Sequence, residues 1–359
     1  MARVAYLGAD GTMDQTFSFS GASSSRVLLG PGATKQLPDV VDALQPHGVV
    51  VVHDEGLAAT AAEVAAALGA ASTLPVRGDD EGKQLTVVGE LAEQLHGAGA
   101  TRATVVVAVG GGTVTDLVGF VASIYLRGVP FVSCPTTTLA MCDAALGGKN
   151  GVDHCGLKNR LGTIRQPDAI VMDTDWLGTL PDELFCEGLV EVVKKAAVLD
   201  AARFVELEAL APALRARDAD ATERAIAMAV AMKMAVVLAD ERERDRRRAL
   251  NAGHTIGHAV ESLAAGDLRH GAAVAMGLVA ECRAADVDHA VTARIDALLR
   301  ALGAATEIPP RLRDARELWE RAQRDKKASR GDVPMYVPRA LGAGEVVNLT
   351  PTSLAKALA

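Results

Sequence analysis

The chain has 359 residues, longer than an average single domain, so its length predicts two domains. Hydrophobic residues make up 49% and charged residues 23%, which is typical of a globular protein, and the net charge of −8 argues against a nucleic-acid or anionic-membrane partner. No apolar run reaches the roughly 18 residues that a membrane-spanning helix needs.

Short apolar runs alternate with helical patterns through the first half of the chain. Runs 49–53 and 104–109 are mostly valine, which is typical of strands buried on both faces. Further strands are predicted at 25–29, 129–134 and 169–172, and helices at 58–68, 85–95 and 117–125. This alternation predicts an α/β domain over residues 1–178, with a parallel, doubly wound sheet.

Glycines or a carboxylate follow two of the predicted strands. Gly111 and Gly112 belong to a run of three glycines before a helix, where the backbone can approach a pyrophosphate at the helix N-terminus. The run lacks the GxGxxG spacing, so a tight structural turn is the alternative. Asp54 follows the first valine run; a carboxylate there holds ribose hydroxyls or caps the next helix.

The pattern changes to helical spacing beyond about residue 179. Helices are predicted at 187–199, 201–210, 219–238, 249–264 and 272–285, with almost no strand pattern among them. The second domain, residues 179–359, is therefore predicted to be mainly α-helical.

Three histidines gather in one stretch of this helical half. His254 and His258 are four residues apart, so they share a helix face, and His270 follows shortly after. Imidazole is the commonest zinc ligand, and Thr255 excludes the zincin motif, which needs glutamate there. Glu191 could complete a His2Glu set, although spacing does not prove it, and two structural histidines are the alternative.

Many cations stand beside polar turns or inside apolar helices of this acidic chain. Lys194 and Lys233 lie among apolar residues, where an unpaired ammonium group is costly. Cations at such positions usually have an anionic partner, and the set favours a substrate with more than one negative group; snorkelling to the surface or an internal salt bridge is the alternative. The set comprises Arg127, Lys149, Lys158, Lys194, Lys233, Arg247, Lys326 and Lys327.

The five cysteines show no CxxC spacing, and the first residues lack the basic and apolar regions of a signal peptide. We therefore expect free thiols and a cytoplasmic location.

A succession of motifs resembles the sugar phosphate cyclase superfamily, and within it the 3-dehydroquinate synthases most. They include GGGTVTDLVGF, YLRGVPFVSCPTTTLAMCDAALGGKNGVD, LKNRLGTIRQP, GLVEVVK, DERERDRRRALNAGHTIGHAVE, RHG and RDKK, in family order. The resemblance implies a Rossmann-like NAD domain, a helical metal-binding domain, zinc with cobalt as a substitute, and a homodimer.

The resemblance also implies roles for individual residues. The metal ligands would be Glu191, His254 and His270. The substrate phosphate would contact Lys149, Asn159, Asn251, His258 and Lys326, with Arg127 from a neighbouring subunit. The hydroxyls and carboxylate would be held by Lys194, Lys233 and Arg247. The NAD site would include Asp80, Lys83, Gly111, Gly112, Asp116, Thr136, Thr137, Asp143, Lys158 and Thr179, besides Asp54.

The implied reaction is a phosphate-eliminating cyclisation of 3-deoxy-arabino-heptulosonate 7-phosphate to 3-dehydroquinate. NAD would oxidise a hydroxyl whose oxygen zinc polarises, phosphate would leave, the hydride would return, and an aldol step would close the ring. Lys233, Arg247 and His258 favour a substrate with a carboxylate, because cyclitol-forming relatives generally have proline at the position of His258.

Departures from the dehydroquinate synthase pattern leave a specialised cyclase as the alternative. They are Thr115, Asn150, Ala272 and the KNRLGT segment. The alternatives are an aminodehydroquinate synthase, a sedoheptulose 7-phosphate cyclase making a valiolone-type product, and a deoxy-scyllo-inosose synthase. An NAD-dependent polyol dehydrogenase of the glycerol dehydrogenase type and a non-catalytic binding protein are more remote, since the Lys149, Lys158 and Asn159 cluster and the metal ligands argue against them.

Overall fold

The computed structural model describes residues 8, 11–20, 23–155, 157–324 and 333–359. The chain forms two compact units, Met1–Pro181 and Asp182–Ala359. Every helix in the described ranges is too short or too polar to cross a lipid bilayer.

The first unit is built on a seven-stranded sheet in the order β1-β2-β9-β6-β5-β3-β4. The strands are β1 (Met13–Ser18), β2 (Ser24–Gly30), β3 (Gly48–Asp54), β4 (Ser72–Val76), β5 (Thr104–Gly110), β6 (Phe131–Pro135) and β9 (Ala169–Asp173). Neighbouring strands are parallel except β1 and β2. The predicted α/β sheet is confirmed, and β4 escaped prediction because it is a half-exposed edge strand.

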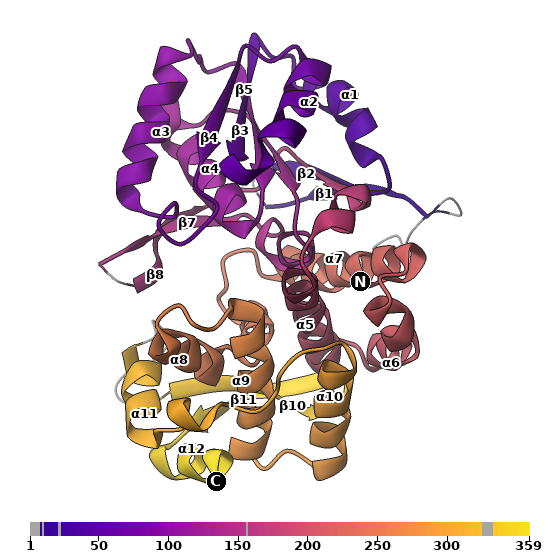
Figure 1. Cartoon of the computed structure of the whole chain (residues 1–359), viewed down its shortest axis with the longest axis vertical. Coiled ribbons are helices and arrows are strands. Elements are labelled where there is room, and N and C mark those ends of the chain that lie inside the picture. The colour runs from indigo at the N-terminus through magenta and orange to yellow at the C-terminus, as the bar shows by residue number, and fades with distance from the viewer. Residues whose placement is uncertain (1–7, 9–10, 21–22, 156, 325–332) are drawn as a thin grey trace. The chain divides into compact units, whose positions relative to one another are not determined.

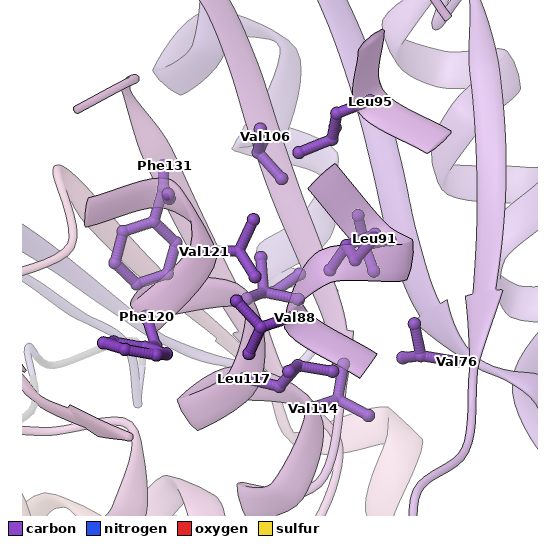
Figure 2. Packing of buried hydrophobic residues seen from close by; sticks show 14 of the residues in the cluster. Val76, Val88, Leu91, Leu95, Val106, Val114, Leu117, Phe120, Val121 and Phe131 are labelled. Carbon is purple, nitrogen blue, oxygen red and sulfur yellow. The ribbon is translucent and has the colours of Figure 1, made fainter. Parts of the chain in front are cut away.

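Helices cover both faces of this sheet (Figure 1). Val50 and Val106 pack against α3 (Leu85–Gly97) and α4 (Gly112–Ile124), in the cluster that Figure 2 shows. Val51 and the other alternate residues of β3 and β5 pack on the opposite face, where the helices are α1 (Leu37–Asp42) and α2 (Ala58–Leu68). Burial on both faces explains the continuous valine runs.

A hairpin and several short turns of the first unit carry residues that were predicted to bind ligands. An antiparallel hairpin is formed by β7 (Lys149–His154) and β8 (Leu157–Ile164), apart from the main sheet. A π-helical turn, η4 (Ala140–Ala144), precedes it, and short 3-10 turns include η2 (Glu55–Leu57), η3 (Tyr125–Arg127) and η5 (Thr174–Thr179). The sequence pattern did not predict the hairpin, because β8 is mostly exposed and polar.

The second unit is mainly helical, as predicted. Its helices are α5 (Asp182–Leu199), α6 (Ala201–Arg215), α7 (Ala219–Ala239), α8 (His254–Ala264), α9 (His270–Ala284), α10 (His289–Ala301), α11 (Ala315–Arg324) and α12 (Pro351–Leu358). A hairpin of β10 (Val333–Ala340) and β11 (Ala343–Leu349) was not predicted. Pro334 and Pro338 interrupt the strand pattern of β10, because proline cannot donate to a sheet ladder.

The predicted helix 249–264 was wrong at its start. Residues Arg246–Asn251 form the 3-10 turn η6, and α8 begins only at His254. Gly253, between η6 and α8, has a φ of +76°, a left-handed conformation that changes the direction of the chain. His254 therefore stands at the first position of a helix.

Candidate active site

Three imidazole rings converge in the second unit. α8 places His254 and His258 on one face, and His270 is the first residue of α9. The ring centroid of His254 lies 4.9 Å from that of His258 and 5.3 Å from that of His270. One ring nitrogen from each of the three lies within 4.8 Å of the others, which is close enough for one metal ion.

Two of these rings are oriented by contacts through Nδ1. Nδ1 of His254 lies 3.1 Å from the carbonyl oxygen of Ala252, and Nδ1 of His270 lies 3.2 Å from a carboxylate oxygen of Glu261. In each ring Nε2 is then the nitrogen that would coordinate a metal. Burial opposes protonation of His270, but the hydrogen bond and charge of Glu261 outweigh it and raise the pKa of His270.

Glu191 on α5 lies beside this cluster and is fully buried. Its Oε1 lies 3.8 Å from Nε2 of His254. Its Oε2 lies 2.5 Å from Nζ of Lys194 and 3.2 Å from Nζ of Lys195, and both lysines are also buried. Lys194 donates a second hydrogen bond to the carbonyl oxygen of Leu250, 2.6 Å away. The carboxylate thus has one oxygen held by ammonium groups and one beside the imidazole of His254.

Two residues near Glu191 were missed by the sequence analysis. Lys195 could have been found as a cation four residues after a candidate ligand on the same helix. Glu187, one turn before Glu191, is buried against the backbone of Gly271, and its Oε1 has no hydrogen-bond partner among the described residues. Burial raises the pKa of Glu187 against the opposing charges of Arg269 and His270.

Glycines allow α8 and α9 to approach closely enough for the histidines to meet. A Cβ on Gly277 would lie 2.1 Å from the carbonyl oxygen of Gly253 and 2.5 Å from the backbone nitrogen of Gly257. A Cβ on Gly257 would lie 2.9 Å from the carbonyl oxygen of Ala273. No other residue fits these contacts without separating the helices.

A buried carboxylate from α9 caps the N-terminus of α8. Glu281 is fully buried, and its two oxygens accept hydrogen bonds from the backbone N–H groups of Gly253 (2.7 Å) and Ile256 (2.9 Å). A helix N-terminus favours a negative charge, and these two bonds fix the turn that carries His254.

Replacing Glu281 with alanine should therefore weaken both the fold and the metal site. We expect a loss of about 2–4 kcal/mol in the free energy of unfolding, because two donors lose a charged acceptor. We also expect zinc affinity, measured by competition with a chromogenic chelator, to fall about 10-fold or more. The exposed Glu90→Ala is the control. Unchanged zinc affinity in a destabilised Glu281→Ala protein would show that the cap does not position His254.

The remaining polar residues predicted in this unit lie on η6, α7 and α8. Lys233 and Arg247 are buried, and Nη1 of Arg247 donates to the carbonyl oxygen of Glu241 at 2.7 Å. Nδ2 of Asn251 donates to Oε1 of Glu243 at 2.7 Å. His258 is half-buried and lies in the imidazole cluster with His254 and His270. Lys326 lies outside the described residues.

Asp240 organises the loop that leads to Arg247. Its carboxylate accepts hydrogen bonds from the backbone N–H groups of Arg244 (2.8 Å), Asp245 (2.8 Å) and Arg247 (3.0 Å). These bonds lower the pKa of Asp240 to about 2. The ionised carboxylate is thus the form that holds the loop.

Asp240→Asn should lower stability at neutral pH by about 1 kcal/mol. The pKa of Asp240 falls from 3.8 to about 2 on folding. The contribution of Asp240 to stability is therefore complete above pH 3.8 and is lost as the pH falls towards about 2. The difference in thermal midpoint between Asp240→Asn and the unmodified protein should narrow across that window. The exposed Asp42→Asn is the control. A constant difference down to the lower pKa would contradict this account.

Some of the predicted nucleotide-binding residues of the first unit follow β3, β5 and β6 directly. Gly112 is the first residue of α4 and Gly111 precedes it; a Cβ on Gly112 would lie 3.0 Å from that of Ala144. The backbone of Thr136 donates to the carbonyl oxygen of Gly110 at 3.0 Å. Parallel strands end at one edge of the sheet, so these turns lie where nucleotides bind in such folds.

Charged side chains beside this edge form two ion pairs. Nζ of Lys83 lies 2.6 Å from Asp116, and Nζ of Lys158 lies 3.0 Å from Asp80.

Asp54 accepts a hydrogen bond from the backbone of Gly56 at 2.9 Å, so it caps η2. The other predicted contacts are Thr137, whose hydroxyl accepts from the backbone of Ala140, Asp143 in η4, and the exposed Thr179 in η5.

Three predicted phosphate contacts of this unit lie on the β7–β8 hairpin and on η3. Lys149 begins β7 after two glycines with positive φ, Asn159 on β8 bonds through its backbone to Asp153 at 2.6 Å, and Arg127 is exposed at the end of η3. Two departures from the family pattern serve the fold here. Asn150 donates to the carbonyl oxygens of Gly148 and Arg165, and Thr115 donates to that of Gly112.

Comparison with known proteins identifies the family. The family described as 3-dehydroquinate synthase N-terminal matches residues 73–187, and 3-dehydroquinate synthase C-terminal matches residues 188–328. The chain belongs to the 3-dehydroquinate synthase family. The 3-dehydroquinate synthase of Geobacter metallireducens is 40% identical over 81% of this chain and 82% of its own length. That of Corynebacterium efficiens is 36% identical over 92% of this chain and 93% of its own.

Solved structures of sugar phosphate cyclases share the fold of this dehydroquinate synthase family member. A 2-epi-5-epi-valiolone synthase from Streptomyces hygroscopicus subsp. jinggangensis, with NAD+ and Zn2+ bound, has a TM-score of 0.84 and 27% identity, covering 96% of both chains. A 2-deoxy-scyllo-inosose synthase with carbaglucose-6-phosphate, NAD+ and Co2+ also has a TM-score of 0.84, at 23% identity, covering 96% of this chain and 99% of its own.

Proposed function

We propose that this chain is an NAD- and zinc-dependent sugar phosphate cyclase that converts 3-deoxy-arabino-heptulosonate 7-phosphate to 3-dehydroquinate and phosphate. The observation that supports the proposal is the cluster of His254, His258 and His270 in the second unit, with Glu191 beside His254 and with the buried cations Lys194 and Arg247 in the same unit. A metal-ligand set beside buried cations suits a polyanionic substrate that is activated through an oxygen atom. Curated relatives with the 3-dehydroquinate synthase name support this substrate class.

The side chains present fit a divalent metal. Nδ1 of His254 and of His270 is engaged by an oxygen acceptor, and Oε1 of Glu191 lies beside His254. Zinc or cobalt held by Glu191, His254 and His270 would polarise the substrate oxygen at the carbon that NAD oxidises. His258 is the third imidazole of this cluster, and we propose that it contacts the phosphate instead.

The remaining roles follow from charge and place. We propose that Lys194, Lys233 and Arg247 bind the substrate hydroxyls and carboxylate, because buried cations select an anionic group strongly. Lys149, Asn159, Asn251, His258 and Lys326 would bind the phosphate. The NAD pyrophosphate would meet the N-terminus of α4 at Gly111 and Gly112. The nicotinamide and adenosine contacts would come from Asp54, Asp80, Lys83, Asp116, Thr136, Thr137, Asp143, Lys158 and Thr179.

We further propose a homodimer in which Arg127 serves the neighbouring subunit. Arg127 and the preceding Leu126 both have positive φ, at 69° and 51°, a conformation that costs energy in residues with a side chain. Ile124 and Leu126 are exposed large hydrophobic residues beside it. A strained, exposed arginine next to apolar residues suits a contact between subunits.

A second candidate is a cyclase for a sugar phosphate without a carboxylate. It is favoured by the 27% identity and shared fold with the valiolone synthase. Buried Lys233 and Arg247 favour the carboxylate-bearing substrate over it.

The experiment is product identification by NMR and mass spectrometry with the zinc-loaded chain and NAD. The substrates, tested separately, are the deoxyheptulosonate phosphate, its 4-amino analogue, sedoheptulose 7-phosphate and glucose 6-phosphate. We expect 3-dehydroquinate and phosphate from the first. Turnover of only the last two would overturn the proposal, and the metal-stripped protein is the control for zinc dependence.

A further inference from the structure

Arg165, the residue after β8, joins two segments that are distant in sequence. Its guanidinium donates to the carbonyl oxygen of Ala122 at 2.7 Å and to that of Val129 at 2.6 Å. These two carbonyls stand on either side of η3, the turn that carries Arg127. The guanidinium of Arg165 therefore closes the base of this turn, together with the backbone hydrogen bond from the N–H of Val129 to the carbonyl oxygen of Ala122 at 2.9 Å.

The backbone of η3 is sterically strained. Leu126, Arg127 and Gly128 have φ values of 51°, 69° and 120°, three successive residues in the left-handed region. Leu126 and Arg127 each pay the steric cost of a Cβ in that region, so contacts outside the turn must stabilise it. Arg165 provides such contacts, because its guanidinium lies against the turn: a Cβ on Gly128 would lie 3.2 Å from Nη1 of Arg165.

The backbone of Arg165 holds the second segment, the turn before Lys149. Its N–H donates to the carbonyl oxygen of Gly148 at 2.8 Å, and its carbonyl oxygen accepts from Nδ2 of Asn150 at 2.9 Å. Gly148 has a φ of +68°, and a Cβ there would lie 2.9 Å from the carbonyl carbon of Arg165. Lys149 is thus fixed between two residues that are both bonded to Arg165.

We propose that Arg165 is a positioning residue that couples the Arg127 turn to the Lys149 turn. This inference rests on the proposed function, in which Lys149 binds phosphate in its own subunit and Arg127 does so in the neighbour. One residue then links the phosphate-binding cation of one site to the cation that completes the other. Loss of its guanidinium releases the strained turn and weakens phosphate binding, without removing either cation.

The test compares Arg165→Met, Arg165→Lys, Arg127→Met and the double variant Arg165→Met/Arg127→Met. The measurements are the KM for the sugar phosphate, inhibition by inorganic phosphate, and the thermal midpoint. We expect Arg165→Met to raise both KM and the phosphate inhibition constant about 10-fold, and Arg165→Lys to do so less, because an ammonium group cannot bridge both carbonyls in one plane. The exposed Arg102→Met is the charge-matched control.

The double variant separates positioning from general destabilisation. If Arg165 acts through Arg127, its loss adds little once Arg127 is methionine, so the two effects are non-additive. Additive effects, or an unchanged phosphate inhibition constant in Arg165→Met, would overturn the inference. If Arg165→Met does not fold, the same comparison with Arg165→Lys decides.

Failure of the proposed function has a different outcome. If the unmodified chain turns over none of the four sugar phosphates, that function falls, and Arg165 is judged by calorimetric titration with inorganic phosphate. An equal affinity for phosphate in the unmodified and Arg165→Met proteins then overturns the inference as well.

Discussion

Replacing Glu191 with glutamine is expected to remove tight zinc binding and to lower the free energy of unfolding by about 3–5 kcal/mol. Glu191 is fully buried, with Nζ of Lys194 and of Lys195 at 2.5 and 3.2 Å from Oε2. Glutamine keeps the shape but leaves two buried ammonium groups without this counter-charge. It also replaces a charged metal ligand with a neutral amide, so we expect affinity to fall more than the roughly 10–100-fold typical of a lost outer contact.

The measurements are chelator competition for zinc and urea denaturation of the metal-free protein. Lys195→Met separates the two roles of Glu191, because it removes one ammonium group and leaves the carboxylate. The double variant Glu191→Gln/Lys195→Met should regain part of the lost stability but none of the zinc affinity. Unchanged zinc affinity in Glu191→Gln would exclude Glu191 as a ligand and point to His258, whose ring nitrogen lies in the same cluster.

Gly277→Ala is expected to destabilise the second unit by about 3 kcal/mol or more, the upper end of the range for overpacked cores. The added methyl group would lie 2.1 Å from the carbonyl oxygen of Gly253 and 2.5 Å from the backbone nitrogen of Gly257. Neither backbone atom can move without shifting the start of α8. Since that start carries His254 while α9 carries His270, zinc affinity should fall together with stability.

The control is Gly89→Ala, also a glycine-to-alanine change within a helix. A Cβ on Gly89 would meet nothing within 4 Å, so alanine should stabilise α3 by about 0.5–1 kcal/mol. The two substitutions thus have opposite expected signs in thermal denaturation. A neutral Gly277→Ala would mean that α8 and α9 can separate without cost, and that the glycines do not set the spacing of the histidines.

Much of the fold was predictable because buried strands and helices have recognisable hydrophobic patterns in the local sequence. The valine runs of β3 and β5 have both faces covered, and the spacing of His254 and His258 places them on one helix face. The hairpins β7–β8 and β10–β11 left weaker records, since exposed residues and prolines obscure the period of two.

The candidate site was predictable only as a set of residue types and, through family resemblance, of positions. Nothing local indicates that Glu281 caps the helix of His254, that Arg165 closes the turn of Arg127, or that Gly277 admits the backbone of Gly253. Periodicity records that a residue is buried, whereas the identity of the group that covers it depends on how distant segments pack. The sequence by itself determined the strands buried on both faces, most of the helices and the chemistry of the side chains; the tertiary structure decided the hairpins and which side chains meet.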